Sequence, residues 1–225
     1  MDTNIIHKEI APMKAEPLFP FLAATILAGS ILAFANPAHA ADETEVTRKG
    51  TYTTSNGGSG TASSTTTRSN GTVNRQGSWT NAAGGTGTWQ SQRAWNPSTQ
   101  TATVNGSATR PNGTTANWQG TATRTAPGSI TDKGTITLSN GKTMTYSGTD
   151  TKEAPGTWDR QGVITTASGK TIDRNVVTSV SGGQGTRTAT TTLADGKTVT
   201  RTSSFTQSTA SAAPATPPTP ATQAP

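Results

Sequence analysis

The feature that most constrains the fold of this chain is a pair of glycines, seven positions apart, that recurs at a nearly constant interval. Five copies begin at Gly50, Gly77, Gly106, Gly134 and Gly162, and a sixth begins at Ala189, where alanine replaces the first glycine. The copies start 27, 29, 28, 28 and 27 residues apart. A period of roughly 28 residues indicates a tandem array of small structural units.

Each unit has the pattern of a β-hairpin. In residues 134–146, two alternating segments flank Asn140-Gly141, and this dipeptide is a strong turn signal between strands. A three-residue loop at 139–141 pairs Ile136 with Met144 and keeps apolar residues on one face, which a two-residue loop would not do. Such a loop is a type I turn closed by a glycine in the left-handed conformation. The equivalent turn glycines are Gly57, Gly84, Gly113, Gly141, Gly169 and Gly196.

The same register places a large aromatic ring opposite a glycine in three units. The pairs are Gly77 with Trp89, Gly106 with Trp118, and Gly134 with Tyr146. A ring that covers a cross-strand glycine stabilises a sheet. These pairs therefore support the register.

Each hairpin has one threonine-rich face and one weakly apolar face, and hydrophobic residues make up only 29% of the chain. We predict an all-β fold, an antiparallel up-and-down meander of six hairpin repeats over residues 50–207, curled into a barrel-like form or paired with another chain. A β-solenoid is the alternative. An outer-membrane barrel needs an outward apolar band. The chain after residue 40 has only two leucines, Leu138 and Leu193, which argues against such a barrel.

The two ends of the chain differ in composition from the repeats. Residues 1–40 combine an apolar run with the cleavage pattern Ala38-His39-Ala40 and are predicted to be an export signal, whose true start is Met13 in one interpretation. Residues 41–49 form a short polar lead-in. Residues 208–225, rich in alanine, proline and threonine, are predicted to be a disordered tail. The protein is therefore expected outside the cytoplasm, either in the periplasm or at the cell surface and beyond.

The residue content argues against an enzyme and against bound cofactors or metals. Both histidines, His7 and His39, lie in the predicted signal, and the chain has no cysteine. The mature chain therefore lacks the side chains for Ser-His or Cys-His chemistry and for a His or Cys zinc site. Gly-Lys-Thr occurs three times. A phosphate-binding loop also needs a glycine five residues before this triplet and a helix after it, and the sequence has neither. We therefore interpret the triplets as the ends of turns that lead into strands.

One set of residues is a candidate binding surface. Arg75, Arg160 and Arg187 each stand two residues before a repeat start, and Trp79 and Trp158 lie near them in the sequence. Arginines and exposed rings on a sheet suit polysaccharides or other polyanions. The structural alternative is that the arginines protect a sheet edge from aggregation while the rings cover glycines.

These observations predict an exported, non-enzymatic repeat protein with a structural or surface-binding role at the bacterial cell envelope. The alternative function is a secreted protein that binds glycans or polyanions, and a more distant one is ice binding on the threonine arrays. The expected partners are cell-envelope polysaccharide or further copies of the chain. Nucleic acid is not expected as a partner, and no transmembrane domain is expected in the mature chain.

Overall fold

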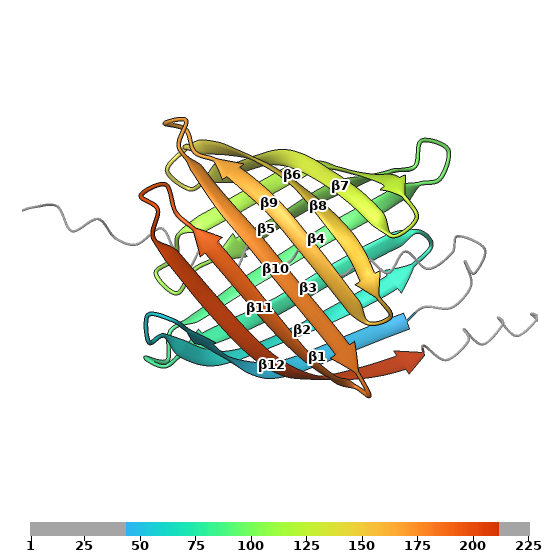
Figure 1. Ribbon diagram of the computed structural model, residues 1–225, viewed down its shortest axis with the longest axis horizontal. Helices are drawn as coiled ribbons and strands as arrows, with labels where there is room; N and C mark the ends of the chain where they lie inside the picture. The colour runs from blue at the N-terminus through green and yellow to red at the C-terminus, as the bar shows by residue number, and fades with distance from the viewer. Residues whose placement is uncertain (1–43, 212–225) are drawn as a thin grey trace, which may run out of the picture.

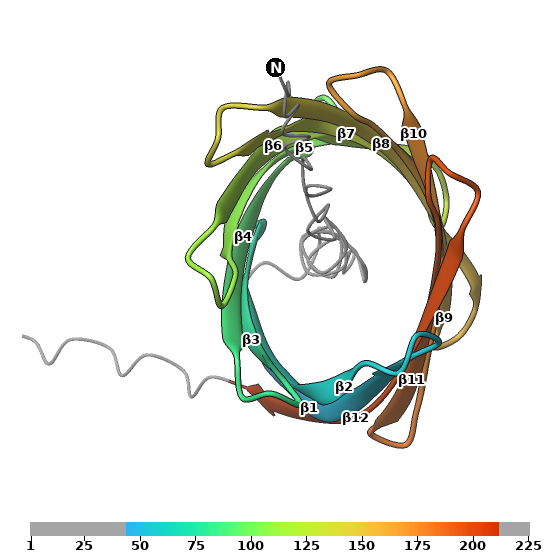
Figure 2. The same ribbon diagram turned by 90° about the vertical axis from the view of Figure 1, so that its left-hand side faces the viewer.

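A computed structural model describes residues 44–211 as a single closed β-barrel of twelve antiparallel strands (Figure 1). The strands are β1 (Thr44–Thr54), β2 (Ser59–Ser69), β3 (Thr72–Asn81), β4 (Thr86–Asn96), β5 (Thr101–Thr109), β6 (Thr115–Ala126), β7 (Ser129–Leu138), β8 (Thr143–Ala154), β9 (Thr157–Thr165), β10 (Thr171–Ser181), β11 (Gln184–Thr192) and β12 (Thr198–Ser211). Each strand pairs with its neighbours in the sequence. Strand β1 also pairs with β12, so the ring of strands is complete (Figure 2).

The predicted antiparallel meander with barrel-like closure is confirmed. The β-solenoid alternative is wrong, because successive strands run antiparallel and the first strand pairs with the last. Closure removes the exposed edges that an open sheet would present. The strands also extend further than predicted: β1 begins at Thr44, inside the expected lead-in, and β12 continues to Ser211, inside the expected tail. The predicted export signal lies outside the described residues.

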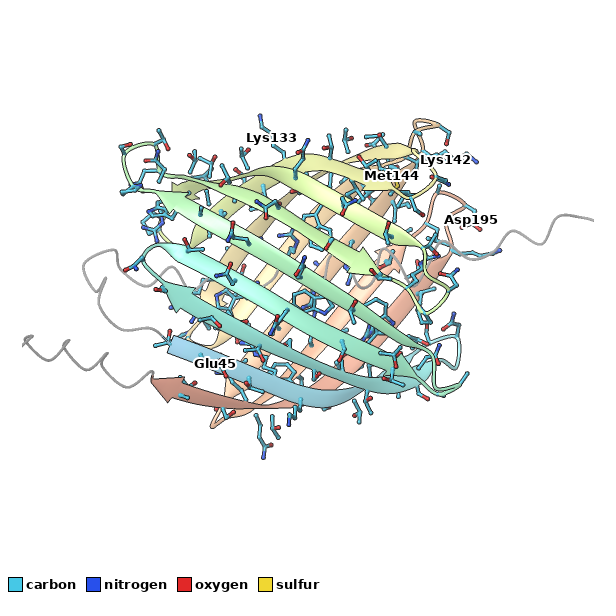
Figure 3. All side chains as sticks on the ribbon, turned by 180° about the vertical axis from the view of Figure 1, so that it is seen from behind. Glu45, Lys133, Lys142, Met144 and Asp195 are labelled. Atoms are coloured by element: carbon cyan, nitrogen blue, oxygen red, sulfur yellow. The ribbon has the colours of Figure 1, made fainter. Side chains whose placement is uncertain are left out.

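The hairpin loops follow the turn chemistry of the repeats. In the loop between β7 and β8, the Leu138 amide donates to the Lys142 carbonyl at 2.9 Å, and the Gly141 amide donates to the Leu138 carbonyl at 2.9 Å. Gly141 has a φ of 78°, in the left-handed region that favours glycine. The other five turn glycines also have positive φ: Gly57, Gly84, Gly113, Gly169 and Gly196. Lys142 and Asp195 lie in loops at the same end of the barrel (Figure 3).

The side chains alternate between the interior and the outer wall of the barrel, as the period of two in a strand requires. In β10, Ile172, Val176 and Thr178 are buried, and the residues on the opposite parity are mostly exposed. In β6, Asn117 and Gln119 are exposed on the outer wall. Most large apolar side chains therefore point inward, and the outward positions are mostly polar.

Aromatic rings lie against the glycines of the inner wall. The strand pairing places Gly77 opposite Trp89, Gly106 opposite Trp118, and Gly134 opposite Tyr146. A Cβ atom added at Gly106 would lie 2.3 Å from Cζ2 of Trp118, so only glycine leaves room for the ring. Three further contacts of the same kind were not predicted from the sequence: Gly87 with Trp79, Gly60 with Tyr52, and Gly185 with Phe205.

Candidate functional site: the barrel interior

The interior of the barrel is lined by arginines as well as by apolar residues. Eight of them, each with a pKa shifted in its buried surroundings, lie on eight different strands: Arg48, Arg68, Arg75, Arg93, Arg160, Arg174, Arg187 and Arg201. Two buried aspartates, Asp132 and Asp150, share the interior with them. Charged side chains are rarely buried unless they are paired. The described interior thus carries a strong excess of positive charge.

The candidate surface residues of the sequence analysis do not lie on the surface. Arg75 and Arg160 are 6% exposed, and Arg187 and Trp79 are 9% exposed. Trp158 is half-buried, at an inward position of β9. The prediction of a surface binding patch is therefore wrong, and so is the sheet-edge alternative, because the closed barrel has no edge there.

Five of these eight arginines are not among the predicted functional residues: Arg48, Arg68, Arg93, Arg174 and Arg201. A signal for them exists, because each arginine has the same parity along its strand as the apolar or small residues that face inward. In β10, for example, Arg174 stands between Ile172 and Val176.

Arg160 on β9 joins the two interior aspartates. Its Nη2 atom lies 2.7 Å from Oδ2 of Asp132 on β7, and its Nη1 atom lies 2.6 Å from Oδ2 of Asp150 on β8. Burial on its own would lower the pKa of Arg160, but Asp150 and Asp132 outweigh it and raise this pKa. These contacts form a buried ion-paired triad, so both interior carboxylates are engaged with Arg160.

Away from this triad, positive charges lie close together in the interior. Burial lowers the pKa of Arg75 well below its ordinary value, and nearby arginines, first among them Arg93, lower it further. Burial has the same effect on the pKa of Arg187, with Arg174 as the strongest of the like charges around it. Like charges in a low-dielectric interior repel strongly. A negatively charged ligand there would relieve that repulsion.

Two interior cavities differ in their charge. One, of about 50 Å³, is lined by Arg93, Arg160 and Arg174 together with Asp132. The second, of about 90 Å³, lies between β1–β3 and β10–β12 and is named here the arginine cavity. Its inward lining includes Arg48, Arg75, Arg187, Arg201, Thr178 and Ser203, and it has no acidic residue among the described residues that line it.

Neighbouring side chains orient two arginines of the arginine cavity. The guanidinium of Arg201 lies over the Tyr52 ring, 3.7 Å from its centre. That of Arg48 lies 5.4 Å from the centre of the Phe205 ring, and its Nη2 donates to Oε1 of Gln207 at 2.7 Å. Stacking and hydrogen bonding hold a guanidinium in a fixed direction. The arginines are therefore positioned by protein groups rather than loosely placed.

The described part of the chain offers little to a metal ion. Within residues 44–211 there is no group of three or more His, Cys, Asp or Glu side chains that could hold one. In the same residues, no helix has the length and hydropathy needed to cross a membrane. The chemistry of the interior is that of cations and hydroxyl groups, which suits the binding of anions.

The sequence matches no known protein family and no curated protein. The fold, in contrast, is similar to that of solved porins. A KdgM porin superposes with a TM-score of 0.56 at 6% identity, covering 72% of this chain and 98% of the porin. A KdgM porin in complex with disordered oligogalacturonate gives a TM-score of 0.54 at 7% identity, covering 72% of this chain and 97% of the porin. At such low identity the likeness is one of barrel fold.

The function predicted from the sequence is overturned by these findings. The surface-binding and glycan-binding functions required the arginines to face outward, and ice binding required a flat threonine array. The chain instead closes into a barrel that shares its fold with porins, and its arginines face inward. The sheet that carries the threonines is curved and closed rather than flat (Figure 2).

Proposed function

We propose that this protein is a water-soluble β-barrel that binds a small anionic ligand in its arginine-lined interior. The observation that carries the proposal is the composition of the interior, where eight inward arginines share the space with two aspartates. Both aspartates contact the same arginine, Arg160. Like charges repel strongly in a low-dielectric interior, and an anionic ligand would offset the repulsion among these arginines.

The outer wall supports solubility in water. Threonine, serine, asparagine and glutamine occupy most outward positions, and Lys133 projects away from the barrel (Figure 3). Among residues 44–211 the only exposed large hydrophobic residues are Val163 and Val177, at 37% and 40% exposure. A barrel in a membrane presents an outward apolar band about 25 Å tall. The wall of this barrel is suited to water, and we propose that the mature chain has no membrane-spanning part.

The second candidate function is a channel that passes anionic solutes. The likeness in fold to porins favours it, and one of the similar porins was solved with oligogalacturonate. The arginines of this chain would suit an anionic solute in either case. The polar outer wall disfavours the channel, because each polar side chain facing lipid costs free energy.

The remaining parts of the proposal concern the setting. We propose that the protein is exported to the cell envelope and that it is not an enzyme. Nucleic acid is not proposed as a ligand. Self-association is a proposed interaction, and the elution volume of the purified protein on a calibrated column would test it.

We further propose that the barrel consists of six copies of one hairpin unit. The glycine frame supports this, because its copies fall on β1, β3, β5, β7, β9 and β11, which share one direction. Deleting one full period, residues 106–133, joins Asn105 to Gly134 at equivalent positions of two units. The shortened chain is expected to remain soluble and rich in β-structure by circular dichroism. Aggregation or loss of the β-signal would contradict the repeat proposal.

The functional proposal is tested by thermal unfolding in phosphate and in chloride at equal ionic strength. At a phosphate concentration near 100 times the dissociation constant, binding adds about 2.7 kcal/mol, which corresponds to a rise in Tm of about 5–10 °C. The double variant Arg75→Met/Arg187→Met is expected to lose this rise. The control Lys133→Met removes a positive charge from the outer wall and is expected to keep it.

Two results would decide against the proposal. An equal rise in Tm for the wild type and the double variant would mean that phosphate acts through general salt effects. Purification only in detergent, with stepwise conductance after addition to planar lipid bilayers, would support the channel instead.

A further inference from the structure

We infer that the ligand site is the arginine cavity and that its ligand is a compact tetrahedral oxyanion, of the phosphate or sulfate type. This inference rests on the proposed function and adds the place and the chemical class of the ligand. It depends on three observations, which are a buried hydroxyl without a hydrogen-bond partner on a residue that lines the cavity, the arrangement of the donors, and the charge of the walls.

The first observation is the hydroxyl of Thr178 on β10. Thr178 is 2% exposed and lines the arginine cavity. Its Oγ1 atom has no hydrogen-bond partner among the residues that the structure describes. A buried hydroxyl without a partner costs free energy and is rare in folded proteins. A ligand oxygen in the cavity would accept a hydrogen bond from it.

The second observation is that donors come from a curved run of neighbouring strands on both sides of the β1–β12 pair. On one side, the strand register aligns Thr178 of β10 with Arg187 of β11, and Arg187 with Ser203 of β12. On the other side, Arg75 of β3 is aligned with Thr66 of β2, and both line the same cavity. Donors on several strands of a curved wall suit a tetrahedral oxyanion, whereas a planar carboxylate presents its oxygens in one plane. Guanidinium forks bind phosphate oxygens in pairs.

The third observation is the charge of the lining. Arg48, Arg75, Arg187 and Arg201 all line the arginine cavity, and the described lining includes no acidic residue. Asp132 lines the other cavity instead, where it is bound to Arg160. A ligand with two negative charges is therefore favoured in the arginine cavity and disfavoured near Asp132. The volume of about 90 Å³ is well above the roughly 10–15 Å³ that a single water requires and restricts the ligand to a compact one.

The inference is tested by isothermal titration of the purified protein with inorganic phosphate, sulfate and acetate at constant ionic strength. Phosphate and sulfate are expected to bind at one site per chain, and acetate at least about tenfold more weakly, because it carries one charge and offers fewer acceptor oxygens. Thr178→Val keeps the shape of the side chain and removes only the hydroxyl. It is expected to weaken phosphate binding about tenfold.

Arg187→Met is expected to weaken phosphate binding about a hundredfold. Arg93→Met, in the lining of the other cavity, is expected to weaken it at most about threefold, through the loss of a nearby positive charge. Lys133→Met on the outer wall leaves it unchanged. Circular dichroism checks that each variant is folded, and Thr178→Val provides the test if Arg187→Met does not fold.

The possible failures are distinguishable. Phosphate binding that Arg93→Met removes and Thr178→Val leaves intact would place the site in the other cavity, and the proposed anion-binding function would stand. Acetate binding as tight as phosphate binding would overturn the tetrahedral class. Absence of binding by all three anions would overturn the proposed function together with this inference.

Discussion

Replacing Arg160 with methionine is expected to destabilise the barrel by about 3–5 kcal/mol. The loss follows from what remains after the substitution. Asp132 and Asp150 contact Arg160 at 2.7 and 2.6 Å, and both are buried. Without the guanidinium, two carboxylates would face each other in the interior with no counter-charge at the same distance. Urea unfolding followed by circular dichroism measures the change in free energy.

The matched control is the triple variant Arg160→Met/Asp132→Asn/Asp150→Asn, which removes the charge of the whole triad. It is expected to recover most of the lost stability, because a buried ion pair contributes little beyond a neutral replacement. The loss in Arg160→Met is also expected to shrink as the pH falls towards 4. Burial raises the pKa of Asp150, an effect that Arg160 opposes in the native protein, and a carboxyl with a raised folded-state pKa favours folding as it gains a proton. A triple variant as unstable as Arg160→Met would show that the aspartates are not the cause.

The hairpins could be predicted from the sequence because their signals are local. The loop at 139–141 and the pairing of Ile136 with Met144 follow from turn chemistry and face parity within thirteen residues, and the structure has this register. The closure of the barrel has no such local signal. It depends on the pairing of β1 with β12, which runs from Thr44 opposite Ser211 to Thr54 opposite Arg201 and joins the two ends of the repeat array.

The candidate site could not be predicted, because the usual rule for charged residues is inverted here. Arginine is almost always exposed, so a column of arginines beside a polar face predicts an outer surface. The parity of Arg174 with Ile172 and Val176 indicates an inward position, but an arginine inside a barrel contradicts that rule. Thr178 gave no signal at all, since its role depends on strands that meet only in the closed barrel.

Trp79 is expected to be a core residue rather than a ligand-binding one, and Trp79→Ala should cost about 3–5 kcal/mol of stability. The ring is 9% exposed and packs with Tyr52 inside the barrel. It also covers Gly87 on the neighbouring strand β4. A Cβ atom added at Gly87 would lie 2.0 Å from Cζ2 of Trp79, and the three nearest atoms all belong to this ring.

This geometry makes a double-mutant cycle informative. Gly87→Ala alone is expected to cost about 1–3 kcal/mol, because the new methyl group displaces the Trp79 ring. In the Trp79→Ala background the same change is expected to be neutral or to stabilise by about 0.5–1 kcal/mol, because alanine restricts the unfolded chain more than glycine does. Trp158→Ala, which removes a half-buried ring at an inward position of β9, serves as the control and should cost less. Additive effects of Trp79→Ala and Gly87→Ala would show that the ring does not lie on the glycine, and the packing described for the inner wall would then be wrong at this pair.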